Sequence, residues 1–184
     1  MKKTLIGILV VVILVVLYGF STYNSLVTLN VGADTQWKQV ETNYQRRFDL
    51  IPNLVESVKG VMKQEQTVFT AIADARTRYS GATTPSDRAA AANQVESALG
   101  RLLVITENYP QLKSSETVQT LMSQIEGTEN RISVERMRYN QAVQAYNLKV
   151  MRIPSSIIAN MTGFDEREYF AAQAGAENAP KVSF

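Results

Sequence analysis

Residues 2–20 read Lys2-Lys3-Thr4 and then LIGILVVVILVVLYGF, a run from Leu5 to Phe20 without a charge. As a helix this run is about 24 Å long, against a hydrocarbon core of roughly 30 Å. Residues 21–23 can lengthen it, because the next charged residue is Asp34. The stretch decides the fold, since a helix that is apolar on every side must be surrounded by lipid or protein. We predict one transmembrane helix in residues 1–22, with the lipid bilayer as a partner.

A cleaved secretory signal is the alternative to a permanent anchor. Signal peptides have a shorter apolar core, and small residues precede their cleavage site. Here the bulky Phe20 and Tyr23 lie where a cleavage site would be, which favours an uncleaved anchor. Lys2 and Lys3 precede the run, and no Lys or Arg follows it before Lys38. The positive-inside rule then predicts a cytoplasmic N-terminus, with the rest of the chain across the membrane.

The composition argues against several classes of function. Residues 21–184 carry 17 Lys and Arg (19 minus Lys2 and Lys3) against 17 Asp and Glu, whereas nucleic-acid binders need a basic surplus. The chain has no Cys and no His, so disulfides, zinc–thiolate sites and histidine bases are excluded. Di-metal bundles need Glu-x-x-His pairs. We therefore expect no catalytic residue, no metal, no cofactor and no nucleic-acid partner.

Beyond the anchor, the apolar residues recur at helical spacing. A stripe with spacings of three and four occupies Trp37, Val40, Tyr44, Phe48, Ile51, Val55, Val58 and Met62, and Phe69, Ile72 and Tyr79 extend it. Turn residues at 81–87 end this region, and Ser86 or Asp87 can cap the next helix. That helix runs to Tyr109, and a third begins at Ser114 or Ser115 and ends at Pro154. No segment alternates as a strand does.

The predicted fold is all-α. An N-terminal single transmembrane helix precedes an antiparallel, up-and-down bundle of three to four long helices. The number depends on Pro52, because proline inside a helix removes a hydrogen bond and clashes with the carbonyl of Phe48. Asp49 is a good N-cap, so a break near Asp49–Pro52 is favoured over one continuous helix. The predicted parts are the anchor at 1–22, a bundle domain at 23–165 and a mobile tail at 166–184.

Four residues around the proline form the densest polar cluster. Arg46, Arg47, Asp49 and Asn53 can make a corner that binds an anion or a peptide. The simpler interpretation is that they satisfy backbone groups freed at a helix break. Both interpretations stay open at this point.

Two further features are candidates for interaction. Tyr139 and Tyr146 are seven residues apart and share one face, as core tyrosines or as a stacking site. The chain ends in Val182-Ser183-Phe184, a form that β-strand addition can capture and that also occurs in frayed termini.

The segment after the anchor is apolar without an evident partner in the monomer. Leu26, Val27, Leu29 and Val31 lie there. Apolar surface at a membrane exit must be covered by lipid, by another copy or by a partner. We therefore expect Leu26 and Val27 to contribute to homo-oligomerisation.

Two long blocks resemble the LemA family. The first runs from Trp37 to Gly60 and includes QRRFDLIPNLVE at residues 45–56; the second runs from Tyr139 through Pro154 to Phe164. The closing Val182-Ser183-Phe184 is also similar to the family. The resemblance implies a single-pass bacterial membrane protein with a helical bundle and no assigned catalytic residue.

The sequence and the resemblance together favour a non-enzymatic, membrane-anchored scaffold of the bacterial envelope that self-assembles. We expect it in the inner membrane, with the bundle on the periplasmic or extracellular side. The alternative is an adaptor or sensor that binds a peptide, a peptidase or another membrane protein partner through the Arg46–Asn53 corner or the C-terminal tail. An enzyme that uses carboxylates, Ser or Lys alone is the least favoured interpretation.

Overall fold

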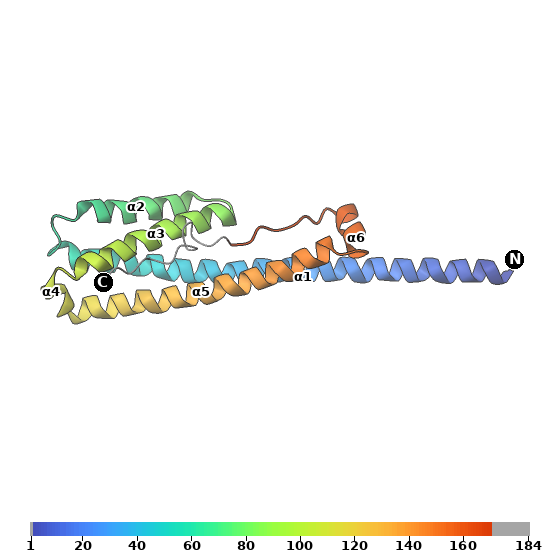
Figure 1. Ribbon diagram of the computed structural model, residues 1–184, viewed down its shortest axis with the longest axis horizontal. Coiled ribbons are helices and arrows are strands. Elements are labelled where there is room, and N and C mark those ends of the chain that lie inside the picture. Colours follow the sequence, from blue (N-terminus) through green and yellow to red (C-terminus); the bar gives the residue numbers. More distant parts are fainter. Residues whose placement is uncertain (1, 171–184) are drawn as a thin grey trace, which may run out of the picture. The chain divides into compact units, whose positions relative to one another are not determined.

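The computed structural model describes residues 2–170, and within that range every regular element is a helix (Figure 1). The elements are α1 (Lys2–Lys59), α2 (Gln66–Gly81), α3 (Pro85–Thr106), α4 (Pro110–Lys113), α5 (Glu116–Met151) and α6 (Ser155–Thr162). The all-α prediction is confirmed for this part of the chain. The short helices α4 and α6 were not predicted.

Helix α1 passes through Pro52 without interruption. The predicted break near Asp49–Pro52 is therefore wrong. The apolar period continues on both sides of the proline, with Phe48, Ile51 and Leu54 all buried. Burial of this continuous face outweighs the loss of one backbone hydrogen bond.

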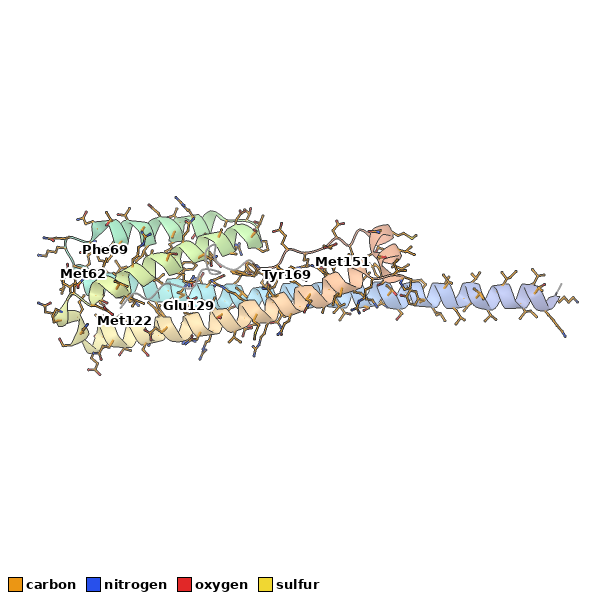
Figure 2. The ribbon with its side chains drawn as sticks, viewed as in Figure 1. Met62, Phe69, Met122, Glu129, Met151 and Tyr169 are labelled. Carbon is orange, nitrogen blue, oxygen red and sulfur yellow. The ribbon has the colours of Figure 1, made fainter. Side chains whose placement is uncertain are left out.

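The real interruption follows Lys59, where Gly60 begins a short turn. The amides of Val61 and Met62 both donate to the carbonyl of Val58, at 3.0 and 2.9 Å, and so close the end of α1. Met62 is fully buried although it lies outside a helix. Met62 and Phe69 flank the turn from α1 to α2 (Figure 2). The stripe predicted over residues 37–79 thus belongs to two helices.

The chain forms two compact units. Of the described residues, unit 1 contains 2–38 and 137–169, and unit 2 contains 39–136 and Phe170. Each has its own buried side chains.

In unit 2, α2 and α3 lie side by side (Figure 1). The start of α3 is fixed by Thr84, whose Oγ1 accepts a hydrogen bond from the amide of Asp87 at 3.1 Å, with Pro85 in the first turn. This is an ordinary N-cap followed by proline. The cap is two residues before the predicted Ser86 and three before the predicted Asp87. Small side chains line the buried face of α3, including Ala91, Ala92 and Ala98.

In unit 1, residues from α1, α5 and α6 form one apolar cluster. Leu26, Tyr146, Val150 and Ala159 are buried in it, and Leu29, Ile158 and Phe164 pack around them. The expectation that Leu26 lacks a partner within the chain is wrong, since none of its surface is exposed. The burial of Leu26 could not be predicted from the sequence, because α6, which contributes Ala159 to this cluster, is too short to give a periodic signal.

The first part of α1 has no protein around it. An 18-residue window in this helix has a mean hydropathy of 2.7 and is 0% buried. It is the one candidate membrane span among the described residues. A core helix would be covered by other parts of the protein, so the full exposure favours a lipid environment.

Candidate functional site

The most polar part of the interior lies in unit 2, around Arg47. Its side chain is fully buried, and it forms an ion pair with Glu129 from α5. Its second terminal nitrogen donates to the carbonyl of Ala92 in α3 at 3.1 Å. Its Nε has no hydrogen-bond partner among the residues the structure describes. The guanidinium also lies over the ring of Tyr44, 5.3 Å from its centroid. Arg47 thus joins three helices inside the bundle.

A second arginine, Arg136 of α5, extends this network. Its Nε donates to the hydroxyl of Tyr44 at 3.1 Å. Its terminal nitrogens donate to Glu96 at 3.3 Å and to Asn93 at 3.2 Å. The ring of Phe170 lies on its face, with the centroid 4.6 Å away. Together the two arginines and their partners form the polar core: Tyr44, Arg47, Ala92, Asn93, Glu96, Glu129 and Arg136.

The tyrosines of this region are held in the protonated form. Burial raises the pKa of Tyr44, although Arg136 and Arg47 oppose the shift. Burial also raises the pKa of Tyr79 to about 12. The Tyr79 ring packs on Phe48 and Tyr44, with centroids 4.4 and 5.5 Å apart. A neutral phenol beside an arginine is a hydrogen-bond acceptor, which suits a structural network better than base or nucleophile chemistry.

The predicted corner does not form as a single site. Arg47 points into the interior, whereas Arg46, Asp49 and Asn53 are exposed on the outer face of α1. Gln45 donates to Asp49 at 2.8 Å on that outer face. Arg47 is therefore committed to the polar core and is not available to an external anion or peptide.

Sequence reasoning missed Arg136, Glu96 and the role of Glu129. A signal was present, because Arg136 occupies the stripe position between Ile132 and Tyr139, where an apolar residue is expected. Arg47 likewise falls seven residues after Val40 on the buried face. A charged residue on an apolar stripe predicts a buried pair, and the sequence does not identify its partner.

A shallow groove of about 620 Å³ lies at another place in unit 2. It is lined by Asn53, Glu56, Ser57, Glu116, Thr117, Thr120 and Leu121. Glu56 and Glu116 are both exposed there. Two carboxylates among hydroxyl groups favour a cationic ligand. Of the corner residues, Asn53 alone belongs to this groove.

In unit 1, both predicted tyrosines are core residues with satisfied hydroxyls. Tyr139 donates to the carbonyl of Glu168 at 3.3 Å, and Tyr146 donates to that of Asp165 at 2.8 Å. Tyr139 also packs on Trp37, with ring centroids 5.4 Å apart. The tyrosines therefore hold the segment after α6, and this arrangement leaves no stacking site at their hydroxyl ends.

Asn147 and Arg167 complete the attachment of that segment. The buried Asn147 amide donates to the carbonyl of Arg167 at 2.8 Å and accepts from its amide at 2.9 Å. The Arg167 side chain donates to Asn30 and pairs with Asp34, both at 2.8 Å. We call these four residues the Arg167 clamp. It fastens the chain after α6 to both long helices within unit 1.

Among the described residues, no group of three or more His, Cys, Asp or Glu side chains could hold a metal ion. The predicted tail residues Val182 and Phe184 lie outside the described range. Val27 is half-buried beside Leu26. The accessible candidates among the described residues include the exposed Arg46, Asp49 and Asn53, the groove lined by Glu56 and Glu116, which we call the acidic groove, and the apolar surfaces.

Comparison with known proteins identifies relatives of this chain. The chain is 28% identical to the magnetosome proteins MamQ 1 and MamQ 2 of Paramagnetospirillum magneticum (strain ATCC 700264 / AMB-1). It is 27% identical to the magnetosome protein MamQ of Magnetospirillum gryphiswaldense (strain DSM 6361 / JCM 21280 / NBRC 15271 / MSR-1). Each match covers 80% of this chain but 64% of the relative, less than two thirds of its length. The model of the LemA family matches residues 36–184, and the chain therefore belongs to the LemA family.

Proposed function

We propose that this protein is a membrane-anchored, non-enzymatic helical scaffold of the bacterial cell envelope. One observation carries the proposal: the uncovered apolar part of α1 continues without a break into Leu26 and Trp37, which are core residues of unit 1. The anchor and the folded unit share one helix. The polar core supports a structural role, because its charged groups are occupied by one another.

The proposed location is the inner membrane, with Lys2 and Lys3 in the cytoplasm and an antiparallel bundle on the periplasmic or extracellular side. The chain has no cysteine, so single cysteines can report its orientation. We expect Thr83→Cys to react with an impermeant maleimide in cells whose outer membrane is permeabilised. Lys3→Cys is the matched control and should react only after lysis. The reverse pattern would place the bundle in the cytoplasm.

Self-assembly needs an exposed surface, and Leu26 cannot supply it. Helix α5 offers one in unit 1: Met137, Gln141, Gln144, Leu148 and Met151 recur at spacings of four and three, and all are exposed. This is the spacing of a coiled-coil seam, with polar residues in the middle that would set the register. We call it the α5 seam, and we propose that it pairs with the same seam of a second copy.

The test is the mass of the full-length protein in mild detergent. We expect a multi-copy particle for the native chain and a smaller one for Met137→Glu combined with Leu148→Glu. Val104→Glu is the matched control, because Val104 is also an exposed apolar residue but lies on α3. Circular dichroism should show unchanged helix content in both variants. A native chain that is monomeric would overturn self-assembly and leave the membrane anchor untouched.

The acidic groove supports a second candidate, an adaptor that binds a cationic segment of a membrane protein partner. Binding of a fluorescent oligolysine peptide tests it. We expect Glu56→Gln with Glu116→Gln to weaken binding at least fivefold, whereas Glu107→Gln, an exposed glutamate outside the groove, should not. Equal binding by all three proteins would reject the groove. Deletion of residues 171–184 without loss of a co-purifying protein would reject an adaptor role for the tail.

A further inference from the structure

Helix α6 has an apolar face that nothing in the described chain covers. Ile157 is 57% exposed and Met161 is 79% exposed, and they are four residues apart on one side of the helix. Ile153, in the turn that precedes α6, is 84% exposed. Three large apolar side chains in water are unfavourable, and exposed patches of this kind mark contact with lipid or protein. We call Ile157 and Met161, together with Ile153 in the turn before them, the α6 face.

The opposite side of α6 is fixed to unit 1. Ser155 and Ala159 are buried there, and Ser155 donates to the carbonyl of Lys149 at 2.7 Å. Gly163, with a φ of 75°, ends the helix in the left-handed conformation that glycine adopts readily. The next residue, Phe164, packs edge-on against Tyr23 of α1, with ring centroids 5.8 Å apart. The α6 face is therefore held in a fixed direction relative to α1.

One contact gives the level of α6 along the anchor. A methyl group placed on Gly19 would lie 3.9 Å from Cδ1 of Ile158. Gly19 is inside the apolar run, about 6 Å along the helix from Tyr23. About 20 residues span the hydrocarbon core, so a span from Thr4 to Tyr23 places Gly19 near its outer end. Helices that lie in the membrane interface are about 5–10 Å deep.

The residues around α6 have the composition of such an interface. No charged residue occurs between Arg152 and Asp165, so nothing charged would have to enter the lipid. Arg152 is exposed at the start and can reach headgroup phosphates. Tyr18 and Tyr23, at the end of the apolar run, are both partly exposed, and aromatic residues at this level form the belts of membrane proteins. Met151 ends α5 immediately before this segment (Figure 2).

We propose that α6 is an interfacial helix whose face, formed by Ile153, Ile157 and Met161, inserts among the lipid chains beside the span. The surface is covered by the bilayer itself, because Ile158, the neighbour of Ile157 in α6, lies against Gly19 in the apolar run of α1 and so places α6 at the level of that run. The proposal rests on the proposed membrane anchor. With α6 inserted, unit 1 meets the membrane through two helices instead of one.

The experiment uses full-length, single-cysteine proteins in nanodiscs that hold one copy each. Ile157→Cys and Met161→Cys are labelled with the environment-sensitive fluorophore NBD. Val12→Cys reports the span, and Val104→Cys reports an exposed apolar position on α3. Quenching is measured with lipids spin-labelled near the headgroup or near the bilayer centre, and with aqueous iodide.

We expect blue-shifted emission at positions 157 and 161, quenched most by the shallow spin label and protected from iodide at least threefold relative to position 104. Position 12 should be quenched most by the deep label. Iodide access at 157 and 161 with a protected position 12 would overturn the α6 proposal alone. Iodide access at position 12 would overturn the anchor as well. Protection of 157 and 161 that appears only when two copies share a disc would assign the face to a second copy and also overturn the proposal.

Discussion

The ion pair between Arg47 and Glu129 joins a fully buried cation to a partly hydrated anion. The Arg47 side chain is 0% exposed, whereas that of Glu129 is 31% exposed. Burial of the Arg47 charge therefore depends on the ion pair more strongly than that of the Glu129 charge does. Without its partner, Arg47 would be a charge inside the protein, but Glu129 would still reach water.

Loss of Glu129 should therefore cost more stability than loss of Arg47. We expect Glu129→Leu to lower the free energy of unfolding by about 3 kcal/mol, because it leaves an uncompensated buried guanidinium. Arg47→Met puts an apolar chain beside Tyr44 and should change stability by about 1 kcal/mol or less. Chemical denaturation followed by circular dichroism measures both. Equal losses of unfolding free energy in the two variants would show that the ion pair itself, and not the burial of the Arg47 charge, determines the loss.

Alkaline stability should depend on Tyr79. Its pKa in the folded protein is about 12, against about 10 in an unfolded chain. Between these values the unfolded chain loses its proton first, so the free energy of unfolding falls as the pH rises from 10 to 12. Below pH 10 both states are protonated and there is no effect.

The matched variant is Tyr79→Phe, which has no proton to lose. We expect its stability to decline less across this range, by up to about 2 kcal/mol, since the ring is partly exposed. Denaturation at several pH values gives the slope, and ultraviolet absorbance counts the phenolates. A slope identical to that of the native chain would exclude Tyr79 as the cause.

The Arg167 clamp should protect the segment after α6 from protease. Asn147→Leu removes two hydrogen bonds to the backbone of Arg167, at a cost of about 2 kcal/mol. We expect trypsin to cleave after Arg167 at least tenfold faster in this variant, with little change in total helix content. Ala145→Leu is a control at an exposed position of the same helix, outside the α5 seam. Unchanged cleavage in Asn147→Leu would mean that Tyr139 and Tyr146 hold the segment without the clamp.

Pro52 should lower the stability of the folded protein. The proline leaves the carbonyl of Phe48 without its usual donor in the helix, so Pro52→Ala should stabilise the protein by about 1–3 kcal/mol. Pro85 is the natural control because it lies in the first turn of α3, where no hydrogen bond is lost. Pro85→Ala should change stability by less than about 0.5 kcal/mol. Loss of stability in Pro52→Ala would show that the proline has a packing role.

Much of the fold could be predicted from periodicity alone. The apolar span follows from an uncharged run, and the buried positions Trp37, Tyr44 and Phe48 follow from one repeated spacing. The error at Pro52 arose because a local penalty of about 3 kcal/mol was weighed without the packing of a whole helix face. The end of α1 at Gly60 is hard to predict, because the apolar stripe continues beyond the turn into α2.

The candidate sites could be predicted less well. The sequence groups Arg47 with its neighbours, either as a binding corner or as the support of a helix break, and neither interpretation gives it a buried ionic partner, because adjacent residues on a helix point in different directions and the sequence alone does not reveal the partner helix. Leu26 was assigned to self-assembly because the residues of α6 that cover it are more than 120 positions away in the chain. Both cases concern which distant segments meet.

The uninterrupted helix between the span and Leu26 has a mechanical consequence. A bilayer that is thinner or thicker than the apolar run makes a single helix tilt. Here no loop separates the tilting segment from the packed residues Leu26, Ala33 and Trp37. Any tilt is therefore transmitted to the contacts around Tyr146 and Val150, and the thickness of the host membrane becomes a variable in the stability of unit 1.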